Sequence, residues 1–192
     1  MKAIPRRYEV ATRQVGKFKH GGLDRLLLTA EKYINGAIAQ RERILDDMRW
    51  DHGSFEVKHS MIFLDVHYYF ICCARVRHLL QAMAARDGDP ELIGIANRMK
   101  KKTGFMNDAR KLLEHVEDYI SLEDSSEFSV VTTETYTFAG EDFDISEVGL
   151  EHLTKAYEEM ISVLEKRPID PSFLDLLKRI QKDGSNSTFN SR

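Results

Sequence analysis

Arg110 and His115, with four residues between them, are the side chains whose types and spacing best suit chemistry. An imidazole titrates near neutral pH, so it can take a proton from a reacting oxygen or return one. A guanidinium can hold an anionic group through charge-assisted hydrogen bonds while negative charge builds up on it. The pair therefore suits acid–base chemistry on a phosphate-containing ligand.

The helix that must position this pair is expected from about Phe105 to Ser121. At about 100° per residue, His115 points about 160° away from Leu113, the centre of the apolar stripe, so we do not expect it in the core. Arg110 lies about 60° from Leu113, and only its long side chain could converge with His115 on one ligand. A symmetric dimer over this polar face would bring two such pairs together.

Charge is strongly segregated along the chain, although the net charge is only −3. From Leu112 to Thr154 there is no Lys or Arg, and this acidic stretch should repel phosphate. We expect anionic ligands to meet the basic arm before the first helix or the basic segment before the acidic stretch. The phosphate-binding candidates in that segment are Lys100, Lys101, Lys102 and Lys111. A run of lysines is also typical of a solvated helix face.

Most enzyme motifs are absent, including G-x-S-x-G, G-x-x-x-x-G-K-[ST], G-x-G-x-x-G and H-E-x-x-H. Glu56 and His59 have the Glu-x-x-His spacing that helical bundles use for metals. A dimetal site needs a second such motif and two further carboxylates, which the sequence does not offer in the required direction. We therefore predict no metal and no cofactor.

Apolar residues recur at helical spacing in four further segments, at about 23–48, 58–86, 90–102 and 147–166. Asp89 before Pro90 is typical of a helix cap and first turn. Between about 128 and 146 the period changes to alternation, with a turn at Ala139-Gly140-Glu141-Asp142, which predicts a β-hairpin. The expected fold is an all-α antiparallel bundle of four to five main helices with this hairpin inserted. The segment from about 58 is expected to be the central helix.

The chain divides into a basic arm at 1–20, the bundle at 21–167, and a short helix with a disordered tail at 168–192. No secretory signal is visible, and the longest apolar stretch, 61–74, is interrupted by Asp65 and His67 and is too short for a membrane span. Adjacent cysteines at 72 and 73 suit a reducing compartment. We therefore expect a cytoplasmic protein without a membrane partner.

The Arg-x4-His spacing lies in the segment Ala109-Arg-Lys-Leu-Leu-Glu-His-Val-Glu-Asp118, and a second helix carries Leu64-Asp-Val-His67-Tyr-Tyr-Phe. Late in an all-helical chain of this length, these segments resemble the HEPN superfamily. The resemblance covers about 23–166, with the hairpin as an insertion. One departure is Lys111, which stands where the family usually has Asn, Asp or another polar residue directly after the Arg.

This resemblance implies a metal-independent endoribonuclease that acts as a homodimer, with the active cleft between the subunits. The family's His corresponds to His115 and its Arg to Arg110. In that role the imidazole would move the proton of an RNA 2′-OH or of the leaving oxygen, and the guanidinium would hold the phosphate. The superfamily supplies toxins and phage-defence proteins, which implies an antitoxin or another protein partner.

Two further interpretations remain open. The chain could be a non-catalytic module whose bundle surface and acidic hairpin bind a protein partner. Alternatively, Arg110 and His115 could belong to a solvated helix face with local pairs, such as Arg110 with Glu114. Asp65 and His67 are expected to be core polar groups paired with Arg75, Arg77 or another helix. For His78 and His152 the sequence offers no partner at ligand spacing.

Overall fold

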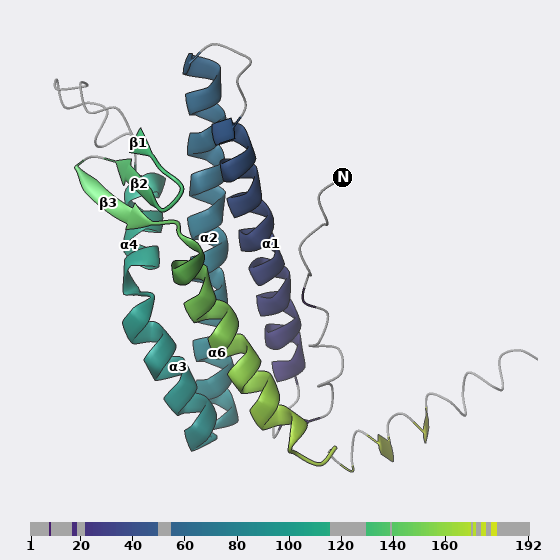
Figure 1. Ribbon diagram of the computed structural model, residues 1–192. Coiled ribbons are helices and arrows are strands. Elements are labelled where there is room, and N and C mark those ends of the chain that lie inside the picture. The colour runs from purple at the N-terminus through teal and green to yellow at the C-terminus, as the bar shows by residue number, and fades with distance from the viewer. Residues whose placement is uncertain are drawn as a thin grey trace, which may run out of the picture.

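The computed structural model describes residues 8, 17–18, 22–49, 55–115, 130–138, 140–169, 171, 174–175 and 178–179, and of 55–60 and 130 only the backbone. Within these residues the chain forms five helices: α1 (Leu23–Arg49), α2 (Phe55–Asp87), α3 (Pro90–Lys102), α4 (Gly104–Glu114) and α6 (Glu147–Glu165). A small antiparallel sheet stands between α4 and α6, with strands β1 (Val130–Val131), β2 (Thr135–Phe138) and β3 (Glu141–Asp144). The predicted all-α bundle with an inserted hairpin is confirmed (Figure 1).

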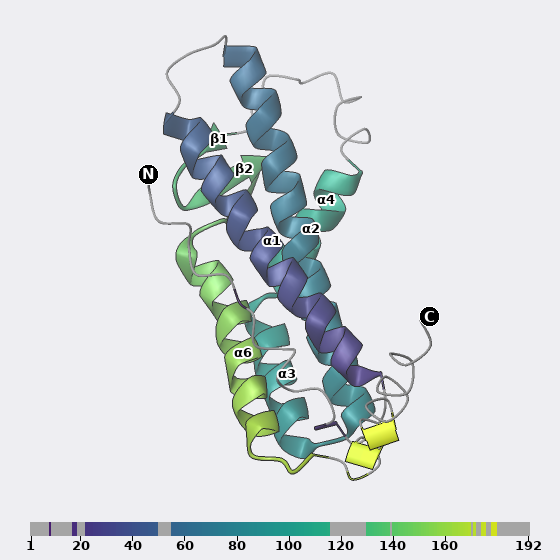
Figure 2. The same cartoon turned by 90° about the vertical axis from the view of Figure 1, so that its right-hand side faces the viewer.

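Helix α2 is the centre of the bundle, as its sequence predicts. It contacts α1, α3, α4 and α6, and Figure 2 shows α1 crossing it on the face away from the sheet. Apolar side chains occur around most of its circumference, so several faces can be buried at once. None of the helices in the described ranges is long and apolar enough to cross a membrane.

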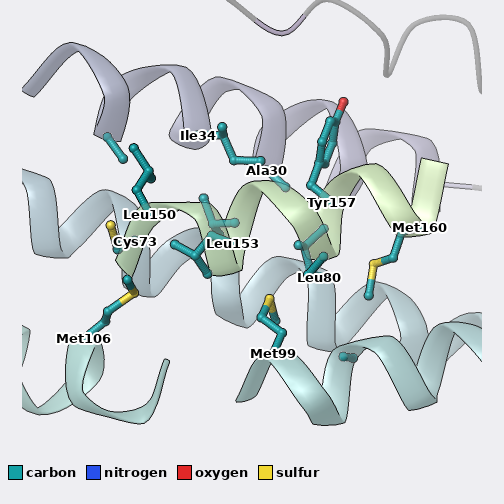
Figure 3. Close-up of a cluster of buried hydrophobic side chains, with 14 of the residues drawn as sticks. Ala30, Ile34, Cys73, Leu80, Met99, Met106, Leu150, Leu153, Tyr157 and Met160 are labelled. Atoms are coloured by element: carbon teal, nitrogen blue, oxygen red, sulfur yellow. The ribbon is translucent and has the colours of Figure 1, made fainter. Parts of the chain in front are cut away.

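The core lies where α6 packs against the other helices. Figure 3 shows side chains of all five helices meeting there, among them Ile34 of α1, Leu80 of α2, Met99 of α3, Met106 of α4 and Leu153 of α6. Tyr157 is fully buried in the same cluster, and its hydroxyl donates to the buried carboxylate of Glu31. This bond satisfies two polar groups that would otherwise be costly to bury.

Helices α3 and α4 are separated by a break at Thr103, close to the bend expected near Gly104. As predicted, Asp89 caps α3, because its Oδ1 accepts the Glu91 N–H at 2.8 Å. The buried Thr103 hydroxyl donates back to the Met99 carbonyl at 2.8 Å, so it closes α3 instead of capping α4.

The predicted length of the helix at 105–121 is wrong, because α4 ends at Glu114 with His115 as its C-cap. The His115 N–H bonds to the carbonyls of Lys111 and Leu112, which closes the last turn. Carboxylates cluster from Glu114 to Asp118, and negative charge at a helix C-terminus opposes the helix dipole. The predicted helical residues 116–121 lie outside the described residues.

The predicted hairpin at 128–146 is a three-stranded meander, β1-β2-β3. Glu141 and Asp142 belong to β3 and not to the turn, which is made at Gly140 with a φ of 73°. An additional turn separates β1 from β2 because the Thr132 hydroxyl accepts the Thr135 N–H at 2.8 Å. Short polar side chains that bond their own backbone compete with strand pairing, which the alternating pattern does not reveal.

The bundle ends at Arg167, whose guanidinium ties the end of α6 to the turn between α2 and α3. It donates two bonds to Asp87, both of 2.9 Å, and a third to Asp89 of 2.7 Å. Beyond it, the described positions 171, 174–175 and 178–179 have helical backbone, and the rest of the predicted short helix lies outside the described residues. The predicted disordered tail lies outside the described residues.

Candidate functional site

Arg110 and His115 lie on the last turns of α4 and at its end. The Arg110 side chain is 22% exposed, and its Nη1 donates to Glu114 Oε1 at 3.3 Å, the local pair that the alternative interpretation predicts. Its Nε is buried without a hydrogen-bond partner. His115 and Lys111 are exposed, as the expected polar face requires. The arginine is therefore only partly satisfied by its own helix.

Helix α4 packs along α2 in the opposite direction (Figure 1). Two histidines of α2 are near enough to charged side chains of α4 to be affected by them. Burial lowers the pKa of His78, and the positive charges of Arg77, Arg110 and Arg75 lower it further. Burial also lowers the pKa of His67, against the opposing effect of Glu114. The charge of Arg110 thus acts on His78 and that of Glu114 acts on His67.

The sequence assigns no role to His67 and His78, but their spacing does place them on one face of α2. They are eleven residues apart, three helical turns, so they share one face of α2 within about 20°. The sequence spacing does not show which side chains of α4 approach that face, because this depends on how α4 packs on α2. The four side chains form a row, because His67 and His78 are about 16 Å apart along the helix axis and cannot share one ligand atom.

The lysines predicted to bind phosphate are divided between two places. Lys111 directly follows Arg110 on α4. Lys100, Lys101 and Lys102 are exposed on the last turn of α3, next to the beginning of α4. Because α4 is about 16 Å long, it separates those three lysines from His115. An extended anionic polymer could reach both groups, whereas a small ligand could not.

An exposed apolar stripe of α2 lies beside this row. Met61, Leu64 and Tyr68, here called the α2 stripe, are 40%, 53% and 55% exposed. The Tyr68 ring stacks near that of His67 at 6.2 Å, so the stripe continues into the row of polar side chains. Because these three side chains share one face of the helix, the stripe is a candidate interaction surface. The sequence pattern predicts a buried α2, and this stripe departs from it.

Other candidates are placed less favourably for chemistry. Asp65 is buried and pairs with Arg43 of α1 at 3.1 Å, so the expectation of a partner on another helix is met. Burial raises the pKa of this carboxyl, partly offset by Arg43, while Asp47 raises it further. Among the residues that the structure describes, no group of three or more possible ligands could hold a metal. The side chains of Glu56 and His59 lie outside that description.

Comparison with known proteins identifies no family. No protein-family model, no curated protein and no solved structure matches the chain. The HEPN resemblance therefore stays a prediction that depends on Arg110, His115 and the segments around them. The function must be inferred from the side chains that α2 and α4 bring together.

Proposed function

We propose that this protein is a metal-independent endoribonuclease that acts as a homodimer and uses Arg110 and His115. The proposal is supported above all by Arg110, whose Nε is buried without a hydrogen-bond partner. Arg110 lies near the end of α4, where His115 is exposed and the α2 stripe is close by. Arg110 would bind phosphate and His115 would move protons. Function in a toxin or phage-defence system belongs to the same proposal.

The reaction follows from the two side chains. His115 takes the proton from a ribose 2′-OH, and the 2′-oxygen then attacks the neighbouring phosphorus. The bond from phosphorus to the 5′-oxygen breaks, and that oxygen receives a proton, which leaves a 2′,3′-cyclic phosphate and a 5′-OH. Arg110 stabilises the charge that accumulates on the phosphate. To do so it exchanges its single 3.3 Å bond to Glu114 for bonds to the phosphate.

A homodimer formed through the α2 stripe would supply the second imidazole that a single protomer lacks. Because Tyr68 adjoins His67 and Glu114 acts on His67, a second copy seated on the stripe approaches the end of α4. Two imidazoles then flank one cleft, where one accepts a proton and the other donates one. Lys111 adds positive charge at the cleft, and Lys100, Lys101 and Lys102 extend the path for the RNA backbone.

The test is cleavage of a mixed RNA pool in the presence of EDTA. Wild-type protein should leave cyclic-phosphate ends, and the Arg110→Ala/His115→Ala double variant should be slower by about 100-fold or more. A matched control is Arg98→Ala/His152→Ala, which removes the same residue types from α3 and α6. Circular dichroism and the melting temperature establish that each variant is folded. Intact RNA with wild-type protein, or equal cleavage by the double variant, would contradict the proposal.

A second candidate function is a non-catalytic module that binds a protein through the α2 stripe. It is favoured by the same stripe and by the Arg110–Glu114 pair, which lowers the charge offered to phosphate. Under this function, Leu64→Asp abolishes capture of the partner and His115→Ala has no effect. Under the nuclease function, Leu64→Asp converts the dimer to a monomer in light scattering and reduces RNA cleavage with it.

A further inference from the structure

The segment before α1 is anchored in the groove between α1 and α6 by Tyr8. The Tyr8 N–H donates to Asn35 Oδ1 at 2.8 Å, and the Tyr8 carbonyl accepts from Asn35 Nδ2 at 2.9 Å. One amide side chain of α1 thus satisfies both main-chain groups of this residue. This pairing fixes the position of the Tyr8 main chain on α1.

The Tyr8 side chain adds a second anchor, on α6. Its hydroxyl donates to Glu158 Oε1 at 2.7 Å, and its ring packs edge-to-face on Tyr157 at 5.5 Å. Burial, followed by the effect of Glu158, raises the pKa of Tyr8 to about 12. Tyr8 is therefore held by its main chain on one helix and by its side chain on the other.

Lys17 gives the direction in which the segment runs. Its Nζ donates to the carbonyl of Glu165 at 3.3 Å, and its own carbonyl accepts from Arg167 at 3.5 Å. From Lys17 back to Tyr8 the chain thus moves from the end of α6 toward its beginning. Tyr8, beside Glu158, therefore lies nearer the beginning of α6 than Lys17, which is bonded to Glu165.

A groove of about 550 Å³ begins at Tyr8 on that side. Ile38 of α1 and Leu150 of α6 give it an apolar lining, and Glu42, Glu147 and Glu151 supply carboxylates. One cation, Arg41, also lines it, and its Nε donates to the carbonyl of Ile145 at 3.0 Å. The groove therefore has an excess of negative charge and suits a basic segment with some apolar side chains.

We propose that residues 1–7 of this chain bind in the groove, with Arg6 and Arg7 against the carboxylates of Glu42, Glu147 and Glu151. This segment contains Lys2, Arg6 and Arg7 and no acidic residue, so its charge complements that of the groove. Its length also suffices, since seven extended residues span about 23 Å. The stretch of α6 from Glu147 to Thr154 rises only about 10 Å.

The consequence is that residues 1–7 of the basic arm are a ligand of the bundle. Its cations face carboxylates, whereas the sequence alone suggests that they meet phosphate. Neutralisation of three carboxylates by an attached segment also removes the repulsion that these groups exert on one another across the groove. This role is independent of the proposed nuclease activity.

Carbodiimide cross-linking of the full chain tests the placement. In the Arg6→Lys/Arg7→Lys variant, which keeps both charges, we expect amide links from residue 6 or 7 to Glu42, Glu147 or Glu151 within one chain. A mixture of ¹⁴N- and ¹⁵N-labelled chains separates links within a chain from links between copies. Links to a second copy, links mainly to the exposed Glu91 or Asp108, or no links from these lysines would each overturn the proposal.

Trypsin cleavage after Arg6 and Arg7 of the otherwise unaltered arm gives a second measurement. The Glu147→Gln/Glu151→Gln variant should be cleaved about threefold to tenfold faster than wild type, because two partly screened ion pairs are lost. The matched control is Glu91→Gln/Asp108→Asn, which makes the same change of charge on α3 and α4 and should leave the rate unchanged. Equal rates in all three folded proteins would overturn the proposal.

Discussion

Arg167 and Arg110 have similar exposure, 15% and 22% of the side chain, but very different surroundings. Arg167 makes three bonds of 2.7–2.9 Å to Asp87 and Asp89, and a longer one to a carbonyl. Arg110 makes one described bond, of 3.3 Å, to Glu114 of its own helix, and its Nε is buried without a partner.

This difference separates a guanidinium that joins distant parts of the fold from one that has only a local pair among the described residues and that we propose binds phosphate. Arg167 joins the end of α6 to the turn between α2 and α3, so its bonds connect distant parts of the chain. The bond of Arg110 connects residues four apart, which a helix brings together on its own. Arg77 also has a buried Nε without a partner, so the contrast rests on the short range of the Arg110 pair and on its effect on His78.

Replacement of Arg167 should have the largest effect on stability. Arg167→Ala removes the guanidinium from the fully buried Asp87 carboxylate, and we expect a loss of about 2–4 kcal/mol in the free energy of unfolding. Urea denaturation measures it. The matched control is Arg98→Ala, whose ion pair with Glu159 is 64% and 39% exposed and should contribute less than about 1 kcal/mol. Equal losses in the two variants would show that the network around Arg167 has no special role.

The two regions should also lose stability in different ranges of pH. The native pKa values of His67 and His78 are lowered from 6.5, so the unfolded chain binds protons first as the pH falls below that value. The contribution of these neutral histidines to the free energy of unfolding is therefore full above pH 6.5. It is lost as the pH falls from 6.5 to their lower native pKa values. Denaturation at about pH 7.5 and 5.5 should show this slope, and His78→Gln should reduce it. An unchanged slope in the variant would contradict this assignment.

At the Arg167 end the corresponding loss requires stronger acid. The Glu91 N–H, and then Arg167, lower the pKa of Asp89 from 3.8, so its contribution is present above that value and disappears as the pH falls through the native pKa. Denaturation below about pH 4 should therefore be less steep in Asp89→Asn than in wild type. If the stabilities of Asp89→Asn and wild type diverged near pH 6 instead, the Arg167 end would not differ in its pH range from the histidines near Arg110.

Replacement of Arg110 should have the smallest effect on stability. We expect Arg110→Ala to change the free energy of unfolding by less than about 1 kcal/mol, since its ion pair is local and one of its nitrogens is unsatisfied. The pKa of His78 should rise, because one of the positive charges that lower it is removed. An NMR titration of the imidazole measures this, with Arg98→Ala as the control. A pKa of His78 that stays constant would show that the two side chains do not interact.

The sequence predicted the features that depend on neighbouring residues. The boundaries of α1, α3 and α6 agree within about two residues, because apolar spacing, the Asp89 cap and the acidic first turn of α6 are local. The Arg110–Glu114 pair was predictable for the same reason. The end of α4 was not, because the apolar spacing continues past the point where the acidic charges disfavour a helix.

Features that join distant segments could not be derived from spacing. The approach of Arg110 to His78 depends on how α4 lies on α2, and residues 32 positions apart give no periodic signal. The clamp of Asn35 on the main chain of Tyr8 likewise joins segments 27 residues apart. Exposure of the α2 stripe depends on which faces of the central helix its neighbours leave uncovered.

The most direct test of the difference between the two arginines is to measure RNA cleavage in EDTA and melting temperature together for wild type, Arg110→Ala and Arg167→Ala. We predict that Arg110→Ala cleaves about 100-fold more slowly at an almost unchanged melting temperature. Arg167→Ala should melt several degrees lower and, at a temperature where it is still folded, cleave at the wild-type rate. Absence of cleavage by wild type, or equal cleavage rates for Arg110→Ala and wild type, would contradict the assignment of Arg110 to a ligand.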